Sequence, residues 1–296
     1  MTTGAPAQCA CYGFVTVQRP EAIRDRIGGL PRYGAEMATL PFKDTTLRET
    51  AAQHRAELAR RWALASEPCA EQVSTPPTRL LLGELGWVAE PVKRLFRPAL
   101  DIAEARHKRT VMLLPGFGAH PIRMRYMARQ LEKAGHTAKR WGVGYNFGAT
   151  EDRFRKVERR LIDLFERTGE PVVLVGWSLG GVMAREIGKL HPDKVAKIVT
   201  MGSPFSGSPR ANNGWRAYQA IAGHRVDEPE FEANPSEKPP VETVALWSPR
   251  DGVVSPRSAC GRPGERDRTI CLRCAHMGFV NTPEAIETVL RELDCP

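Results

Sequence analysis

The sequence predicts an α/β fold in which a mostly parallel sheet carries helices on both faces. From residue 110 onward, short runs of β-branched and other apolar residues alternate with amphipathic stretches of helical period. This alternation is typical of parallel strands joined by helical crossovers. With 42% apolar and 26% charged residues in 296, the chain can bury a sizeable core, which excludes a disordered or fibrous protein.

Residues 1–109 show helical signals without strand pairs, and we expect them to form an N-terminal helical extension. One helix is expected over residues 44–66, where an Asp-Thr-Thr cap precedes apolar side chains at helical spacing that include Leu58 and Trp62. A second helix is expected after Pro76-Pro77, with one apolar face made by Leu81, Leu85, Val88, Val92 and Leu95.

The apolar faces of these two helices are expected to pack on the core or on a second copy of the chain. The alternative is contact with an anionic membrane surface, because four basic residues accompany the second helix, namely Arg79, Lys93, Arg94 and Arg97. The oligomeric state is left open.

Residues 110–296 are expected to form the catalytic domain, with five helices and at least five strands. The predicted strands are 110–114, 172–175, 197–201, 241–247 and 268–272. A further strand is expected to end at Trp141. The predicted helices are 122–134, 150–167, 179–190, 215–222 and 283–293. Ligands bind at the carboxyl ends of parallel strands, so catalytic residues are expected in the loops that follow them.

The clearest chemical motif is Gly176-Trp-Ser178-Leu-Gly180, which an apolar strand enters and an amphipathic helix leaves. In this context Ser178 is expected at a tight turn that lifts its hydroxyl above the sheet, with the glycines allowing strand and helix to approach. The start of the helix would supply backbone N–H groups for a developing negative charge. An ordinary glycine-rich turn is the structural alternative.

A serine nucleophile needs a base, and the base needs an acid that orients it. Asp251 follows the strand at 241–247, and His276 follows the strand at 268–272. The order Ser178, Asp251, His276 is the chain order of the α/β hydrolases. His224 is a weaker candidate because it precedes the acid in the chain.

An oxyanion hole requires two backbone donors. Leu179, which follows the candidate nucleophile, is expected to supply one of them. The loop Pro115-Gly-Phe117-Gly118 after the first strand is expected to supply the other from Phe117, because its glycines let the backbone turn its amides toward a substrate.

Residues 110–294 resemble the α/β-hydrolase superfamily, and in particular its bacterial lipase and esterase members. The motifs that carry the resemblance are LLPGFG, VGWSLGGVMARE, VTMGSPFSG, SPRDGVV and CAHMGF. The resemblance implies a serine hydrolase that acts through an acyl-enzyme, with carboxylic esters as the commonest substrates. This sequence departs from the family in having Pro115-Gly116 where His-Gly is usual. The resemblance does not indicate a particular substrate.

The 38 residues from Ser203 to Pro240 are expected to form a short cap over the site. A cap of this length favours esters of small or medium acyl groups. The side chains expected to line the substrate pocket are His120, Tyr145, Phe147, Phe205, Trp215 and Tyr218.

Three of the seven cysteines, Cys260, Cys271 and Cys274, lie between the candidate acid and base. Two alternatives are left open: a disulfide from Cys260 to one of the other two cysteines, or free buried thiols. The spacing does not favour a zinc site, and we expect no metal or organic cofactor.

The net charge of +9 suggests nucleic acid or an anionic membrane as a partner, but the even distribution of the charge along the chain argues against both. Residues 1–109 hold 16 Lys and Arg against 12 Asp and Glu, and the remainder holds 27 against 22. No apolar stretch approaches the ~18 residues of a membrane span, and no secretory signal stands at the start, so a cytoplasmic location is expected.

The sequence therefore predicts a carboxylic-ester hydrolase with Ser178, Asp251 and His276 as its triad. An acyltransferase or amidase with the same triad is the alternative within catalysis, since an acyl-enzyme does not specify its acceptor. A non-catalytic binding module on the same fold is the alternative outside it.

Overall fold

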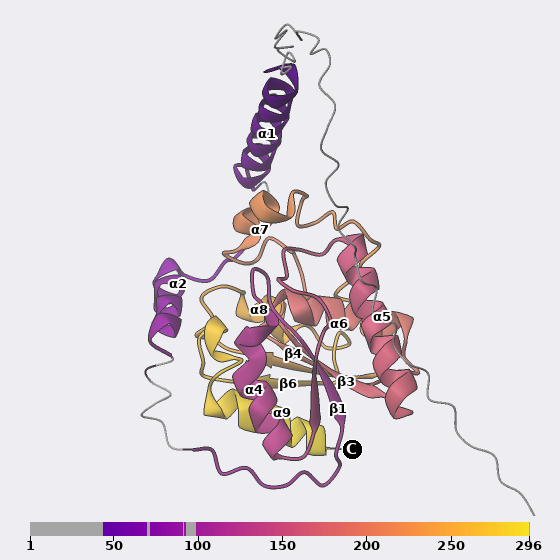
Figure 1. The fold of residues 1–296 in the computed structure, drawn as a ribbon. Helices are drawn as coiled ribbons and strands as arrows, with labels where there is room; N and C mark the ends of the chain where they lie inside the picture. The colour runs from indigo at the N-terminus through magenta and orange to yellow at the C-terminus, as the bar shows by residue number, and fades with distance from the viewer. Residues whose placement is uncertain (1–43, 70–71, 91, 93–98, 296) are drawn as a thin grey trace, which may run out of the picture. The chain divides into compact units, whose positions relative to one another are not determined.

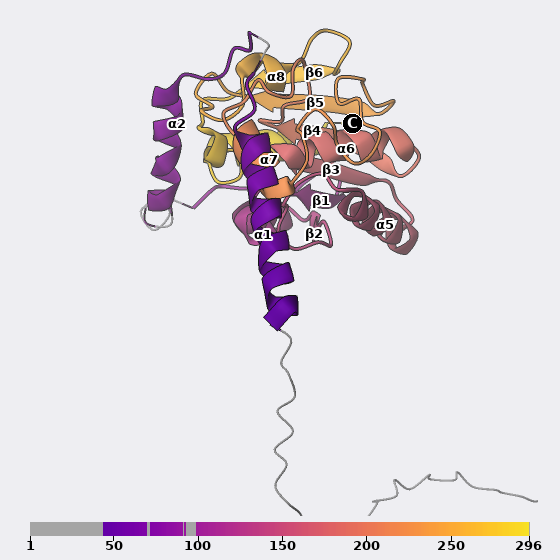
Figure 2. The same cartoon turned by 90° about the horizontal axis from the view of Figure 1, so that it is seen from above.

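The computed structural model describes residues 44–69, 72–90, 92 and 99–295 (Figure 1). Its centre is a six-stranded sheet with the order β2-β1-β3-β4-β5-β6, which can be followed in Figure 2. All five neighbouring pairs are parallel. The strands are β1 (Thr110–Leu114), β2 (Thr137–Arg140), β3 (Val172–Trp177), β4 (Val195–Met201), β5 (Glu242–Trp247) and β6 (Arg268–Cys271).

The parallel sheet and the five predicted strands are confirmed, each with its ends within two residues of the expected ones. β2 is an edge strand of sequence Thr-Ala-Lys-Arg whose residues are all partly or fully exposed, so it lacks the apolar pattern of the others. β1 and β3 lie side by side with Leu114 opposite Gly176, and β3 and β4 pair as far as Trp177 and Met201. This register brings the carboxyl ends of the central strands to one edge of the sheet.

Helices cover both faces of the sheet, as the alternation of strands and helices predicts. On β1, Val111 and Leu113 point into one core with Met127, while Met112 and Leu114 point into a second core. Helices α4 (Arg125–Lys133) and α9 (Pro283–Asp294) complete the first core, and α5 (Glu151–Thr168) and α6 (Leu179–Leu190) complete the second. Side chains that alternate in this way are what a strand buried on both faces requires.

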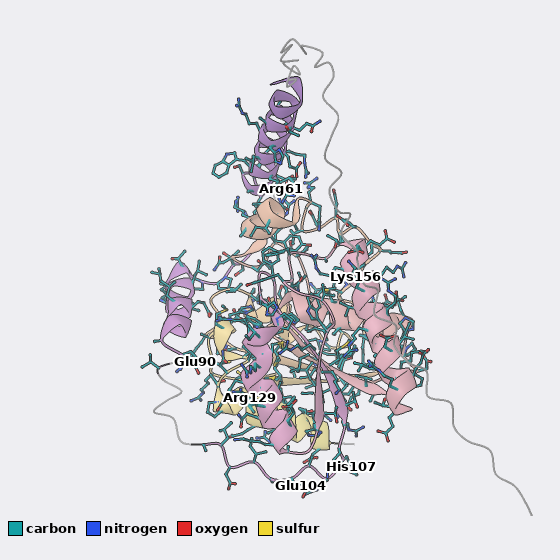
Figure 3. The ribbon with its side chains drawn as sticks, viewed as in Figure 1. Arg61, Glu90, Glu104, His107, Arg129 and Lys156 are labelled. Atoms are coloured by element: carbon teal, nitrogen blue, oxygen red, sulfur yellow. The ribbon has the colours of Figure 1, made fainter. Side chains whose placement is uncertain are left out.

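Shorter helices lie in the loops around this core. They are η2 (Pro121–Met124), α7 (Trp215–Ala222), α8 (Pro256–Cys260) and η3 (His276–Gly278). The exposed side of α5 carries charged side chains, as in the pair of Lys156 with Asp152 at 2.6 Å (Figure 3). No helix of the described residues is both long enough and apolar enough to cross a membrane.

The N-terminal part contains α1 (Asp44–Ala65), α2 (Thr78–Glu84) and η1 (Leu85–Ala89), where two helices are expected. Several of their apolar side chains are exposed rather than packed on the core, and packing on a second copy of the chain stays a prediction. The exposed fractions of Leu58 and Trp62 are 67% and 74%, and those of Leu85 and Val92 are 63% and 56%. The contacts of α1 come instead from polar groups near its end, where Arg60 and Arg61 donate to backbone carbonyls of α7 and its C-cap. Lys93, Arg94, Leu95 and Arg97 lie outside the described residues, as does the placement of the Val88 side chain.

Candidate active site

Ser178 stands in a sharp turn between the end of β3 and the start of α6. Its φ of 54° is the only positive value among the described non-glycine residues, and such a conformation is strained. Glycines make the turn sterically feasible: a Cβ on Gly176 would lie 2.4 Å from the Cα of Gly181, and one on Gly180 would lie 2.2 Å from the carbonyl oxygen of Leu114. The geometry is that of a nucleophile turn, as the motif predicts.

Asp251 and His276 lie together in the loops that follow β5 and β6. The Nδ1 atom of His276 is 2.8 Å from Oδ2 of Asp251, and both side chains are almost completely buried. The other carboxylate oxygen of Asp251 accepts hydrogen bonds from the backbone N–H groups of Val253 and Val254, each at 2.8 Å. These bonds fix the carboxylate, and a proton held on Nδ1 leaves Nε2 of the imidazole as an acceptor.

The surroundings of His276 shift its pKa upward. Burial of the imidazole favours the neutral form and lowers the pKa, but the charge of Asp251, its hydrogen bond to the ring and the charge of Glu84 outweigh burial. The ring also lies beside Trp177, with 5.6 Å between ring centroids, and the indole N–H donates to the backbone carbonyl of His276 at 3.1 Å. The imidazole is thus held in a defined position and its protonated form is stabilised.

Glu84, the last residue of α2, contacts the loops of both Asp251 and His276. Its Oε1 atom accepts from the backbone N–H groups of Gly252 and His276 at 2.8 and 2.7 Å, and Oε2 accepts from Met277 at 2.9 Å. Only 6% of Glu84 is exposed. Sequence reasoning missed this residue, because a glutamate at the end of a short helix has no local signal that points to a distant loop.

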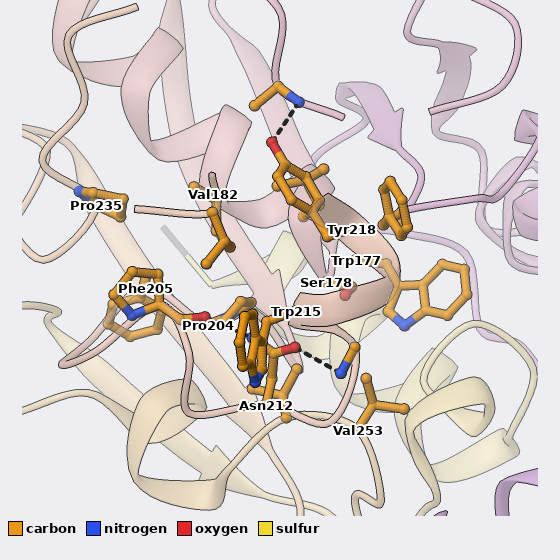
Figure 4. A pocket seen from close by; sticks show the side chains of 18 of the residues that line it. Trp177, Ser178, Val182, Pro204, Phe205, Asn212, Trp215, Tyr218, Pro235 and Val253 are labelled. Carbon is orange, nitrogen blue, oxygen red and sulfur yellow. Dashed lines mark hydrogen bonds between the residues drawn. The ribbon is translucent and has the colours of Figure 1, made fainter. Parts of the chain in front are cut away.

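One cavity of about 740 Å³ opens at these residues, and its wall includes Ser178, Leu179, His276 and Phe117 (Figure 4). Five of the six predicted pocket residues line it, namely His120, Tyr145, Phe205, Trp215 and Tyr218. Phe147 does not line the cavity. It is 46% exposed and stacks on the outer side of Tyr145, with 5.3 Å between ring centroids.

The loop after β1 packs directly against the turn at Ser178. A Cβ on Gly116 would lie 3.0 Å from the Cβ of Ser178, so a larger residue here would force its neighbours to shift. Asn146 holds the loop in place. Its side-chain amide donates to the backbone carbonyl of Pro115 at 2.8 Å, and its backbone carbonyl accepts from the N–H of Gly118 at 2.7 Å. Phe117 and Leu179 both line the cavity, as Ser178 does.

Residues of the 203–240 segment make up a large part of the cavity wall, among them Phe205, Trp215 and Tyr218 (Figure 4). The hydroxyl of Tyr218 accepts from the backbone N–H of Ala149 at 3.0 Å, and its ring lies 5.1 Å from that of Phe117. Burial raises the pKa of Tyr218 to about 12, so the phenol is neutral at physiological pH. His120 contributes differently, because its Nδ1 accepts from Ile122 N–H and caps η2.

The cysteines between the acid and the base are not cross-linked. Cys260, Cys271 and Cys274 are free thiols, so of the two alternatives that the sequence leaves open the disulfide is wrong. Burial is the main cause that raises the pKa of Cys274 to about 12, which makes this thiol unreactive. Within the described residues, no group of three or more His, Cys, Asp or Glu side chains is arranged to hold a metal ion.

Comparison with known proteins agrees with this architecture. Residues 109–236 match the family model described as alpha/beta hydrolase fold, a span that contains Ser178 and the loop after β1 and ends before Asp251. No curated protein matches the chain.

Several solved structures are similar at low identity. A gene product of Listeria innocua is 20% identical, with a TM-score of 0.46 over 64% of this chain and 95% of that one. The Bacillus licheniformis lipase BlEst2 is 14% identical, with a TM-score of 0.49 over 66% and 96%. A pyrethroid hydrolase from Sphingobium faniae is 14% identical, with a TM-score of 0.45 over 64% and 99%. From the family match, the sheet topology and the turn at Ser178, we conclude that the chain has the α/β-hydrolase fold.

Proposed function

We propose that this protein is a serine hydrolase that cleaves carboxylic esters through an acyl-enzyme on Ser178. The observation that carries the proposal is that His276, whose imidazole lies 2.8 Å from the buried carboxylate of Asp251, lines the same cavity as a serine in a strained strand-to-helix turn. A carboxylate that orients a histidine beside a serine is the arrangement that activates a hydroxyl for acyl transfer.

In the first half-reaction, the hydroxyl oxygen of Ser178 bonds to the ester carbonyl carbon while Nε2 of His276 takes the hydroxyl proton. The carbonyl oxygen becomes an oxyanion, for which the backbone N–H groups of Phe117 and Leu179 are the proposed donors. Leu179 is the first residue of α6, where backbone N–H groups lack partners within the helix. Collapse of this intermediate breaks the bond to the alcohol, which leaves with the proton from His276.

In the second half-reaction, water adds to the acyl carbon and gives its proton to His276. The carboxylic acid then departs, and the proton returns to the oxygen of Ser178. Asp251 keeps the imidazole in the required tautomer and stabilises its charged form in both halves.

The cavity supports esters with an uncharged, apolar acyl or alcohol part. Its volume of about 740 Å³ is that of a pocket for a drug-sized ligand. Among the residues on its wall, Arg123 and Asp227 are the ones with a permanent charge, and Asp227 is already paired with Arg210 at 3.1 Å. A positively charged substrate group would therefore lose its hydration without gaining a free carboxylate.

The test is hydrolysis of p-nitrophenyl esters with acyl chains of graded length, by the wild-type protein and by Ser178→Ala. We expect turnover with apolar acyl groups and a loss of about 10⁶-fold in kcat for the alanine variant. No turnover with any ester, together with acyl transfer to an alcohol or thiol, would replace hydrolysis by transfer as the function.

A further inference from the structure

We propose that Glu84 is a positioning residue for the catalytic pair, so that α2 of the N-terminal part completes the active site rather than serving as an appendage. This inference rests on the proposed function of Ser178, Asp251 and His276. It goes beyond that function because it assigns a role to a residue outside the span 110–294 that carries the family resemblance.

The hydrogen bonds of Glu84 support this role. The carboxylate accepts three backbone N–H groups, one from the loop of the acid and two from the segment of the base, at 2.7–2.9 Å. Gly252 directly follows Asp251, and His276 donates through its own backbone N–H. One buried side chain therefore ties together two loops that β5 and β6 carry separately.

The packing of α2 is shaped for this contact. A Cβ on Gly252 would lie 2.3 Å from the carbonyl oxygen of Leu80, so the absence of a side chain lets α2 approach the acid loop closely. Asn213 holds the same junction from the cap side. Its side-chain amide donates to the carbonyls of Pro76, at 3.0 Å, and Gly252, at 2.8 Å.

Electrostatics add to the positioning. The charged groups that act on the imidazole are Asp251 from the loop after β5 and Glu84 from α2. The charge of Glu84 acts with that of Asp251 to favour the imidazolium form, which is the form that appears when Ser178 loses its proton.

Glu84→Gln is the informative substitution because it keeps the size of the side chain and removes its charge. The amide oxygen can still accept from Gly252 and His276, but the amide nitrogen would face the N–H of Met277 as a second donor. Glu84→Asp keeps the charge with a shorter reach. The matched control is Glu104→Gln, since Glu104 also belongs to the N-terminal part but lies exposed beside Lys108 (Figure 3).

The experiment measures ester hydrolysis against pH, the thermal midpoint, and the extent and rate of Ser178 labelling by a fluorophosphonate, for the wild-type chain and all three variants. We expect Glu84→Gln to lower kcat by about 10- to 100-fold with little change in KM, and to move the acid limb of the pH profile to lower pH. Glu84→Asp should keep the limb near its wild-type position, and Glu104→Gln should behave as wild type.

The inference is overturned if Glu84→Gln keeps the wild-type kcat and acid limb. It is also overturned if its activity falls only in proportion to the number of labelled sites, because Glu84 would then support folding alone. Absence of labelling in the wild-type protein would instead contradict the proposed function, so the two failures are distinguishable.

Discussion

At the scale of single residues, the loops of Asp251 and His276 together fix one imidazole. Asp251 uses one oxygen for His276 and the other for two backbone N–H groups, so its position is determined even without the histidine. His276 is fixed in turn through its ring and, by Glu84 and Trp177, through its backbone. The charge of Asp251 and the hydrogen bonds that position the two residues can therefore be tested separately.

Replacement of Asp251 by Asn tests the role of charge. The amide oxygen can still accept from Val253 and Val254, but the imidazole loses the carboxylate that selects its tautomer. We expect kcat for ester hydrolysis to fall by about 10⁴-fold while the thermal midpoint changes little. Asp163→Asn, on the exposed side of α5, is the control and should retain full activity. An Asp251→Asn protein with wild-type kcat would remove Asp251 from the mechanism.

At the scale of elements, the strand-to-helix turn at Ser178 depends on glycines that let neighbouring backbones touch. In Gly180→Ala the new methyl group would meet the carbonyl of Leu114 at 2.2 Å, so β1 and α6 must move apart. We expect a loss of about 1–3 kcal/mol in the free energy of unfolding and a marked loss of activity. Denaturant titration and ester hydrolysis would measure the two effects.

The control for this substitution is Gly83→Ala in α2, where nothing lies within 4 Å of the new Cβ. There the same change should be neutral or stabilise by up to about 1 kcal/mol, because alanine favours a helix over glycine. Equal effects of the two substitutions would show that the close approach at Gly180 is unimportant.

Some of these elements could be predicted from the local sequence pattern, and others could not. The apolar strands and the loops after β3, β5 and β6 could be predicted because burial on both faces and the strand-end position leave a trace in the sequence. For the weakly apolar edge strand β2 the sequence predicts only an end at Trp141, and the strand ends at the neighbouring Arg140. The exposed faces of α1 and α2 and the role of Glu84 could not be predicted, because they depend on contacts between segments far apart in the chain.

At the scale of the whole molecule, the site draws on five regions: the loop after β1, the turn at Ser178, the loop after β5, the loop after β6, and α2 from the N-terminal part. Residues of the 203–240 segment contribute to the wall of the same cavity. Because His276 is buried among these regions, we expect the activity to depend on pH through the protonation of its imidazole.

The pH dependence follows from the raised pKa of His276. The base works only in its neutral form, and the charges of Asp251 and Glu84 favour the protonated form, so kcat/KM should rise with pH through an acid limb that lies above 6.5. The profile of kcat/KM between pH 5 and 9 with one p-nitrophenyl ester measures this limb. A limb well below 6.5 would mean that burial dominates and that the charges act weakly.

The central claim is that Ser178 is a nucleophile activated by His276. Mass spectrometry of the intact protein and its peptides after treatment with a fluorophosphonate tests it most directly. The account predicts one phosphonyl group per chain, located on Ser178, and none in Ser178→Ala or in a His276→Gln variant over the same time. A wild-type chain that remains unmodified, or one modified at another serine, would contradict the account.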